Sequence, residues 1–95
     1  MITITNRQRA IAVDTSMLTK VVETMLHTLK YDGYDVGILL TTNATIRRYN
    51  RDFRQKDKPT DILSFPFHPE LIAGERIKPL SDDEKNLGDI IISLQ

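Results

Sequence analysis

The hydrophobic and polar positions along this chain repeat with two different periods, which predict short strands separated by helices. Residues 2–6 alternate between isoleucine and a polar residue, the two-residue period of a half-buried strand. Over residues 17–29 the apolar positions lie at helical spacing, which predicts an amphipathic helix with one buried face. These positions are Met17, Leu18, Val21, Val22, Met25, Leu26 and Leu29. Short polar side chains at residues 14–16 can cap the start of this helix, and Gly33 is its predicted stop.

The pattern then predicts a buried strand followed by a second helix. Residues 34–41 contain an apolar run without alternation, which is typical of a strand covered on both faces. The next helix is capped within residues 41–43 and has a single apolar stripe. The stripe consists of Ile46, Tyr49 and Phe53. Pro59 lacks an amide hydrogen and disfavours helix at the residue before it, so residues 55–60 are a predicted loop.

Two more strands complete the predicted fold. Residues 62–67 have the composition of a strand, and Pro66 within them indicates an edge strand or a strand end, because proline cannot donate to the sheet. A polar excursion over residues 68–86 then leads to a last apolar strand at residues 90–94. The order β-α-β-α-β-loop-β predicts an α+β fold, similar to an αβ sandwich, with a mixed four-stranded sheet.

Two of the predicted strands require cover on both faces, yet the chain supplies only two helices. Residues 38–40 and 90–92 are therefore expected to leave an apolar patch on one face of the sheet, which soluble monomers rarely tolerate. The sequence also ends at Gln95, directly after an apolar strand. Two explanations are open, a missing C-terminal part or self-association that covers the face, and the first is favoured.

Composition limits the chain to one small domain and removes several classes of site. The 95 residues include 13 basic and 13 acidic side chains, so the chain is neither a uniformly basic nucleic-acid coat nor an acidic tail. The sequence has no cysteine and two histidines, which excludes disulfides, zinc ribbons and a three-histidine metal site within it. No aliphatic run approaches the ~18 apolar residues of a membrane span, and no targeting signal is apparent, so a cytoplasmic protein without membrane contact is expected.

The charges are unevenly placed, with a basic cluster in and after the second predicted helix. Residues 47–58 contain six basic and two acidic side chains. Arg47, Arg51 and Arg54 lie four and three residues apart, so they share one helix face. Arginine presents a planar fork of donors that fits phosphate oxygens, which makes a phosphate-contacting surface one interpretation. A solvated helix face with local acidic partners is the other, and charge alone favours it.

The two histidines and one glycine give only weak signals. His68 begins a His-Pro-Glu run but has no second histidine as a partner, so a surface histidine is favoured over a metal ligand. His27 borders the apolar stripe of the first helix, where a packed or flanking residue is expected. Gly88 is expected to relieve a tight turn into the last strand, because it lacks the context of a phosphate-binding loop.

One longer run is far more specific than these short signals. Residues 50–66 read Asn-Arg-Asp-Phe-Arg-Gln-Lys-Asp-Lys-Pro-Thr-Asp-Ile-Leu-Ser-Phe-Pro. This run resembles the signature of the YbeY family, the bacterial endoribonucleases of rRNA maturation, with Phe53 and Arg54 as its aromatic–arginine pair and Ile62 where the family has valine. Residues 87–93 are similar to the family's second signature, a Gly-Asp-Ile strand. The resemblance covers essentially the whole chain.

The resemblance implies a metal centre whose ligands this sequence lacks. The family continues into a helix with the pattern His-Gly-x-Leu-His-Leu-x-Gly-Tyr-Asp-His, whose histidines bind zinc and leave a position open for water. None of this pattern is present. Residues 1–95 are therefore expected to form a single incomplete domain, the N-terminal part of the family domain without its C-terminal metal-binding helix. Zinc is expected for the complete domain, and no bound metal for this chain.

The resemblance also implies roles for individual residues. Arg54 matches the family's functional arginine, and as a catalytic residue it would neutralise the charge that develops on the scissile phosphate. Ser64 and Phe65 would form the edge strand of the cleft. Asp61 either has a direct role in the site or only closes a turn, and the turn is slightly favoured. The implied RNA-binding residues are Arg47, Arg51, Lys56, Lys58 and Ser64.

The function that the resemblance implies is a zinc-dependent, single-strand-specific endoribonuclease. Its substrate would be the 3′ end of 16S rRNA, in ribosome assembly and quality control, with the small ribosomal subunit, one of its proteins and an assembly GTPase as partners. The 95-residue chain is expected to be inactive alone. The alternative is a non-catalytic RNA- or ribosome-binding module, which metal content would distinguish, and a protease is supported only by fold analogy.

Overall fold

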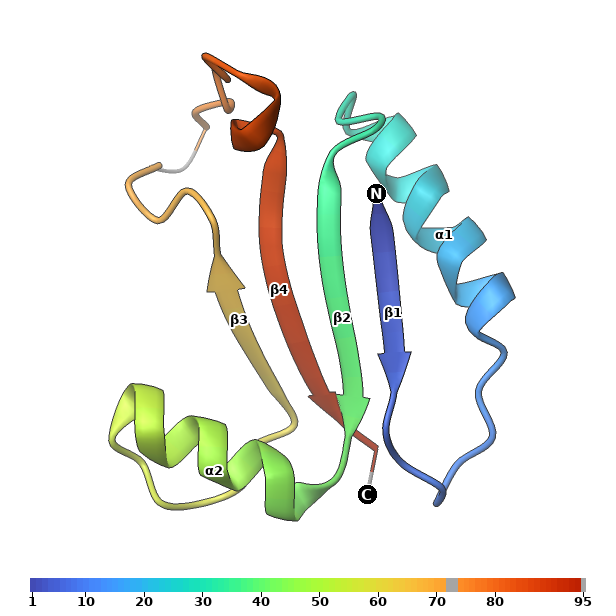
Figure 1. The fold of residues 1–95 in the computed structure, drawn as a ribbon, viewed down its shortest axis with the longest axis vertical. Coiled ribbons are helices and arrows are strands. Elements are labelled where there is room, and N and C mark those ends of the chain that lie inside the picture. Colours follow the sequence, from blue (N-terminus) through green and yellow to red (C-terminus); the bar gives the residue numbers. More distant parts are fainter. Residues whose placement is uncertain (72–73, 95) are drawn as a thin grey trace.

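The structure, a computed structural model, describes residues 1–71 and 74–94 and places two helices around one sheet (Figure 1). The elements in chain order are β1 (Ile2–Asn6), α1 (Thr15–Thr28), β2 (Asp35–Thr41), α2 (Asn43–Arg54), β3 (Ile62–Pro66), the short 3₁₀ turn η1 (Asp82–Glu84) and β4 (Asn86–Ser93). This order confirms the predicted α+β class. The pattern does not predict η1, which lies inside the polar excursion. No helix within the described ranges is long and apolar enough to cross a membrane.

The four strands form one mixed sheet in the order β1-β2-β4-β3 (Figure 1). β1, β2 and β4 run parallel, with Ile38 of β2 opposite Ile4 on one side and Ile90 on the other. β3 lies at the edge and pairs antiparallel with β4, which confirms the interpretation of Pro66 at its end. The polar segment after β3 thus returns the chain so that β4 lies between β2 and β3 and becomes a central strand.

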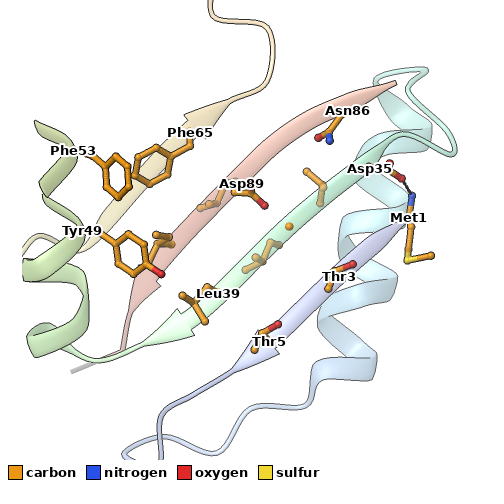
Figure 2. Close-up of a pocket in the computed structure, with 15 residues that line it drawn as sticks. Met1, Thr3, Thr5, Asp35, Leu39, Tyr49, Phe53, Phe65, Asn86 and Asp89 are labelled. Carbon is orange, nitrogen blue, oxygen red and sulfur yellow. Dashed lines mark hydrogen bonds and ion pairs between the residues drawn. The ribbon is translucent and has the colours of Figure 1, made fainter. Parts of the chain in front are cut away.

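The two helices lie on opposite faces of the sheet. α1 packs along β1, whose isoleucines are half-buried while its threonines are exposed on the other face. α2 covers that other face at β3 and β4, where its Ile46 is buried against Leu63 and Ile91. The part of this second face that lies over β1 and β2 carries no helix from the described residues (Figure 2).

Much of the exposed apolar surface lies outside the strands for which the sequence pattern predicts it. Of the six residues at 38–40 and 90–92, three are buried and three are half-buried, so they expose less apolar surface than expected. Four of the exposed apolar side chains lie on one flank of α1, four residues apart. They are Met17, Val21, Met25 and Leu29, with exposed fractions of 50–63%. The neighbouring flank with the buried Leu26 faces β1, and a single strand is too narrow to cover both flanks. Self-association stays a prediction.

The end of α1 also differs from the prediction. The helix stops at Thr28, and Lys30 adopts the left-handed conformation that closes it, with φ of 61°. The amide of Tyr31 bonds back to the carbonyl of Leu26 at 2.8 Å, as in a Schellman motif. Gly33 takes φ of 77° in the turn that follows. The glycine therefore shapes the connection to β2 and not the helix end.

Candidate functional site

The family-like signature folds into the second half of α2, a loop and β3. Gln55 ends α2 in the left-handed conformation, with φ of 56°, and turns the chain back along the helix. Asn50 is buried at 3% exposure, and its side-chain Nδ2 donates to the carbonyl oxygen of Lys58 at 2.8 Å. The carbonyl oxygen of Asn50 accepts from the amide of Lys56 at 3.2 Å. One buried residue therefore fixes the loop that carries both lysines.

Replacing Asn50 with alanine should loosen this loop and lower the free energy of unfolding by about 1–3 kcal/mol. The change removes the donor to the Lys58 carbonyl and leaves a small void beside the helix. Urea denaturation measures the loss. Arg48→Ala, an exposed change on the same helix, is the control and should stay within ~0.5 kcal/mol of the wild type. Equal stability of the two variants would contradict the role given to Asn50.

Two of the three arginines that share a face of α2 are held by local acidic partners. Arg47 Nε donates to Asp57 Oδ1 at 2.8 Å, and Arg51 Nε donates to Asp52 Oδ1 at 3.0 Å. All four side chains are about half-exposed, so the pairs contribute little to stability. For these two arginines the structure favours the interpretation of a solvated face with local partners.

The remaining cations of the basic cluster gather where α2 ends. Arg54 is the last residue of the helix, and Lys56 and Lys58 follow on the loop that Asn50 holds. All three side chains are exposed, and the ion pairs found in residues 1–71 and 74–94 include none of them. These three residues, here called the Arg54 cluster, are thus available to contact an anionic ligand.

Asp57 should titrate below the usual range of an aspartate. The hydrogen bond from Arg47, together with the charges of Arg47 and Arg51, lowers the pKa of Asp57. Because this pKa is depressed in the folded state, the pair stabilises the fold above the unfolded-state pKa, and its contribution is lost as pH falls through the folded-state pKa. Carboxyl NMR titration of the wild type and of Arg47→Gln checks this, since the pKa of Asp57 should be higher in the variant. An unchanged value would contradict the pairing.

The structure separates Ser64 from the basic face of α2. Leu63 and Phe65 point to the face of the sheet that α2 covers, and side chains alternate along a strand, so Ser64 lies on the opposite face. The predicted RNA-binding residues therefore do not form one surface. Asp61, whose direct role the sequence leaves open, is exposed, and its carbonyl oxygen accepts from the amide of Ser93 at 2.9 Å. That backbone bond would join β3 to β4 whatever the side chain does.

An open pocket of about 660 Å³ lies between α2 and the bare part of the sheet (Figure 2). Tyr49, Phe53 and Phe65 form an aromatic wall on one side. Tyr49 stacks on Phe53 with ring centroids 6.0 Å apart, and Phe53 meets Phe65 edge to face at 5.5 Å. Asp35 and Asp89 lie on the floor beyond this wall. The pocket thus combines an aromatic wall with a floor that carries two carboxylates, of which Asp35 is paired with the N-terminal ammonium group. The sequence pattern does not predict this combination.

Asp89 is a residue of this pocket that the sequence analysis misses. It is exposed in the middle of β4, where its neighbours in the strand are otherwise apolar. In the sheet it stands opposite Gly37 of β2, and a Cβ on Gly37 would collide with its carboxylate. The glycine therefore leaves room for the aspartate. A charge within an apolar strand is the signal, but its partner is found only once the strand register is known.

Neither histidine lies in a metal site. His27 is exposed, and its Nδ1 lies 2.7 Å from Asp32 Oδ1. His68 is not the surface residue that the sequence favours: its side chain is 11% exposed, and its Nε2 lies 2.7 Å from the carbonyl oxygen of Glu84, because the polar loop folds back over it. Within the described part of the chain, no three His, Cys, Asp or Glu side chains come together to hold a metal. These residues do not fit a zinc centre.

Relatives of this chain are found among curated proteins. The sequence profile described as Endoribonuclease YbeY matches residues 3–95. The Endoribonuclease YbeY of Homo sapiens is 39% identical over 92 residues, and that of Clostridium acetobutylicum is 38% identical over 110 residues. The two alignments cover 97% and 100% of this chain, but only 55% and 66% of the relatives. The chain thus spans between half and two thirds of their length.

A solved structure shares the fold. The solution structure of TM1509 from Thermotoga maritima superposes with a TM-score of 0.56 at 23% identity, and covers 98% of this chain and 51% of that chain. At this identity the likeness concerns the fold alone. The profile match is the stronger finding, because it extends over nearly all of the sequence and includes both signature runs. The chain therefore belongs to the YbeY endoribonuclease family.

Proposed function

We propose that the complete product of this gene is an endoribonuclease that cleaves single-stranded RNA. The observation that carries this proposal is the Arg54 cluster, three exposed cations at the end of α2 on a loop that Asn50 holds in place. RNA is a polyanion, and its affinity for a protein comes largely from phosphate contacts. A chain without net charge needs a local concentration of cations to make them.

Arg54 is suited to act on the phosphate at which the strand is cut. Hydrolysis joins a water oxygen to phosphorus and breaks one phosphorus–oxygen ester bond, and the charge on the phosphoryl oxygens must be stabilised on the way. A guanidinium offers two parallel N–H donors to these oxygens. In the proposal, Arg54 makes this contact and Lys56 and Lys58 hold flanking phosphates. Arg47 and Arg51, each paired with an aspartate, add only long-range attraction.

The natural substrate that we propose is ribosomal RNA. The proposed target is the 3′ end of 16S rRNA, reached in the cytoplasm during assembly of the small ribosomal subunit; family membership supports RNA as the substrate. A protein of that subunit and a ribosome-assembly GTPase are the proposed partners. Residues 1–95 would be the N-terminal part of the catalytic domain.

A zinc centre is proposed for the complete domain and not for residues 1–95. Zinc sites in proteins are built mainly from histidine and cysteine, and the two histidines of this chain lie on separate elements with partners of their own. The 95-residue chain should therefore contain far less than one zinc per molecule. Metal analysis of a sample whose intact mass confirms its length checks this. Stoichiometric zinc in that sample would contradict the assignment.

A non-catalytic RNA-binding module is the second candidate for the 95-residue chain itself. It is favoured by one observation, that the residues described by the structure assemble no metal site. Such a module would use the Arg54 cluster to bind RNA and would leave the strand intact.

Incubation of the complete gene product with an end-labelled RNA tests the proposal. We expect cleavage of the single strand, protection when the complementary strand is annealed, and loss of activity with a chelator. Binding without cleavage under all metal conditions would replace the endoribonuclease with the binding module. An absence of both binding and cleavage would contradict both candidates.

A further inference from the structure

A second pocket adjoins the first and lies between α2 and the ends of β1 and β2. Its volume is about 770 Å³, and it is open to solvent. Arg48 and Asp52, one helical turn apart on α2, line it together with Arg7, which directly follows β1. Tyr49 and Phe53 line both this pocket and the one shown in Figure 2. Thr5 and Leu39 also line both, so the two pockets are neighbours on one face of the sheet.

The pocket presents two cations without acidic partners. Arg7 and Arg48 are exposed, and neither takes part in an ion pair found in the described ranges. The carboxylate among the lining residues, Asp52, is already engaged, because it accepts from Arg51 Nε at 3.0 Å. The two free guanidinium groups complement an anion, and their planar forks match the oxygens of a phosphodiester.

An exposed aromatic ring lies beside these cations. Phe53 is 63% exposed although it belongs to the apolar stripe of a helix. Tyr49 lies nearly parallel to it, with 16° between the ring planes, and Phe65 contacts it edge to face. Figure 2 shows these rings projecting from α2 and β3 over the sheet. Phe53 is thus held by its neighbours while much of it remains open to a flat partner.

We propose that the pocket bounded by Arg7, Arg48 and Phe53 binds one nucleotide of a single-stranded RNA, away from the position at which the strand is cut. The guanidinium groups contact its phosphate and the base stacks on Phe53. The ligand class rests on the proposed function, which this site deepens: the strand runs from the Arg54 cluster past the exposed Phe53 to the flank of α2 that carries Arg48. The bases of a duplex are stacked on one another, so this site favours single strands.

Fluorescence anisotropy with a labelled oligouridylate tests this site on the chain as it stands. Arg48→Gln should weaken binding and reduce the slope of log affinity against log salt by about 0.7, the value for one lost phosphate contact on a single strand. Arg9→Gln makes the same change at an exposed arginine outside the pocket, and should leave this slope as in the wild type. Phe53→Leu should weaken binding on the order of 10-fold, whereas Phe53→Trp retains a flat ring and should preserve it.

The outcomes separate the site from the function on which it rests. Circular dichroism confirms the fold of each variant, and Arg48→Gln, an exposed change, carries the test if Phe53→Leu does not fold. If the wild-type chain binds the oligouridylate, and Arg48→Gln and Phe53→Leu both bind it with wild-type affinity, the nucleotide site is overturned while the RNA-binding function stands. Equal losses in Arg48→Gln and Arg9→Gln would overturn it too, because they would reduce it to general surface charge. An oligouridylate that the wild-type chain does not bind would overturn the RNA-binding function as well.

Discussion

Replacing Gly88 with alanine should lower the free energy of unfolding by about 3–5 kcal/mol, a loss that few single changes cause. Gly88 lies in β4 with φ of 106°, where an L-residue is strained. A Cβ there would overlap the carbonyl oxygen of Phe65 and lie 2.7 Å from the amide nitrogen of Phe67 and 2.9 Å from the Cα of Pro66. These are backbone atoms of the partner strand β3 and its exit, so they can move only if the β3–β4 pairing opens.

Gly33→Ala separates backbone strain from this collision. Gly33 also has a positive φ, of 77°, but a Cβ at this position would meet no atom within 4 Å. Its replacement should therefore cost about 1–2 kcal/mol, the strain of the left-handed conformation alone. Urea denaturation of both variants gives the comparison. If Gly88→Ala were no more destabilising than Gly33→Ala, the close approach of β3 to β4 would be wrong.

Local periodicity is sufficient to predict the helices and strands of this chain, because neighbouring residues alone determine it. It is not sufficient to predict which faces of a helix or strand are covered by other elements. The apolar stripe of α1 correctly marks an amphipathic helix, yet Met17 and Met25 are exposed because the width of the surface beneath the helix depends on strands elsewhere in the sequence. The same limit explains why α1 exposes apolar side chains that the helical pattern places on a buried face.

The contacts between strands could not be predicted from the sequence, for a different reason. β4 follows β3 in the sequence but lies between β2 and β3 in the sheet, and this insertion places Asp89 opposite Gly37. No local pattern contains that information. The position of Ser64 could have been predicted, since the apolar residues on either side of it, Leu63 and Phe65, must share the covered face and leave Ser64 on the other.

The basic cluster was predictable as a helix face, but its division into paired and free cations was not. Arg47 meets Asp57 only because the loop after α2 turns back, and that turn depends on the left-handed Gln55 and on the bond from buried Asn50 to Lys58. The fold thus occupies Arg47 with a carboxylate and leaves Arg54 without one in the described residues. A difference between these two arginines is therefore the sharpest test of the proposed chemistry.

Replacing Arg54 with alanine in the complete gene product should slow single-turnover cleavage of single-stranded RNA by about 10²–10³-fold, the usual effect of losing one well-placed donor to a developing charge. Stability should change by no more than ~0.5 kcal/mol, because the side chain is exposed at the helix end. Arg54→Lys should restore part of the rate, since a point charge replaces the charge but not the two-pronged contact.

Arg47→Ala is the matched control, because Arg47 lies on the same face of α2 and is also exposed, but its guanidinium is bound to Asp57. It should weaken RNA binding slightly and reduce the salt dependence, with cleavage of bound RNA unchanged. Thermal melts of both variants separate chemistry from folding. A fall in rate at Arg54 without a fall in melting temperature, and without an equal fall at Arg47, requires a contact to the reacting phosphate. Equal and small effects at both positions would instead make Arg54 one more cation of a solvated basic face.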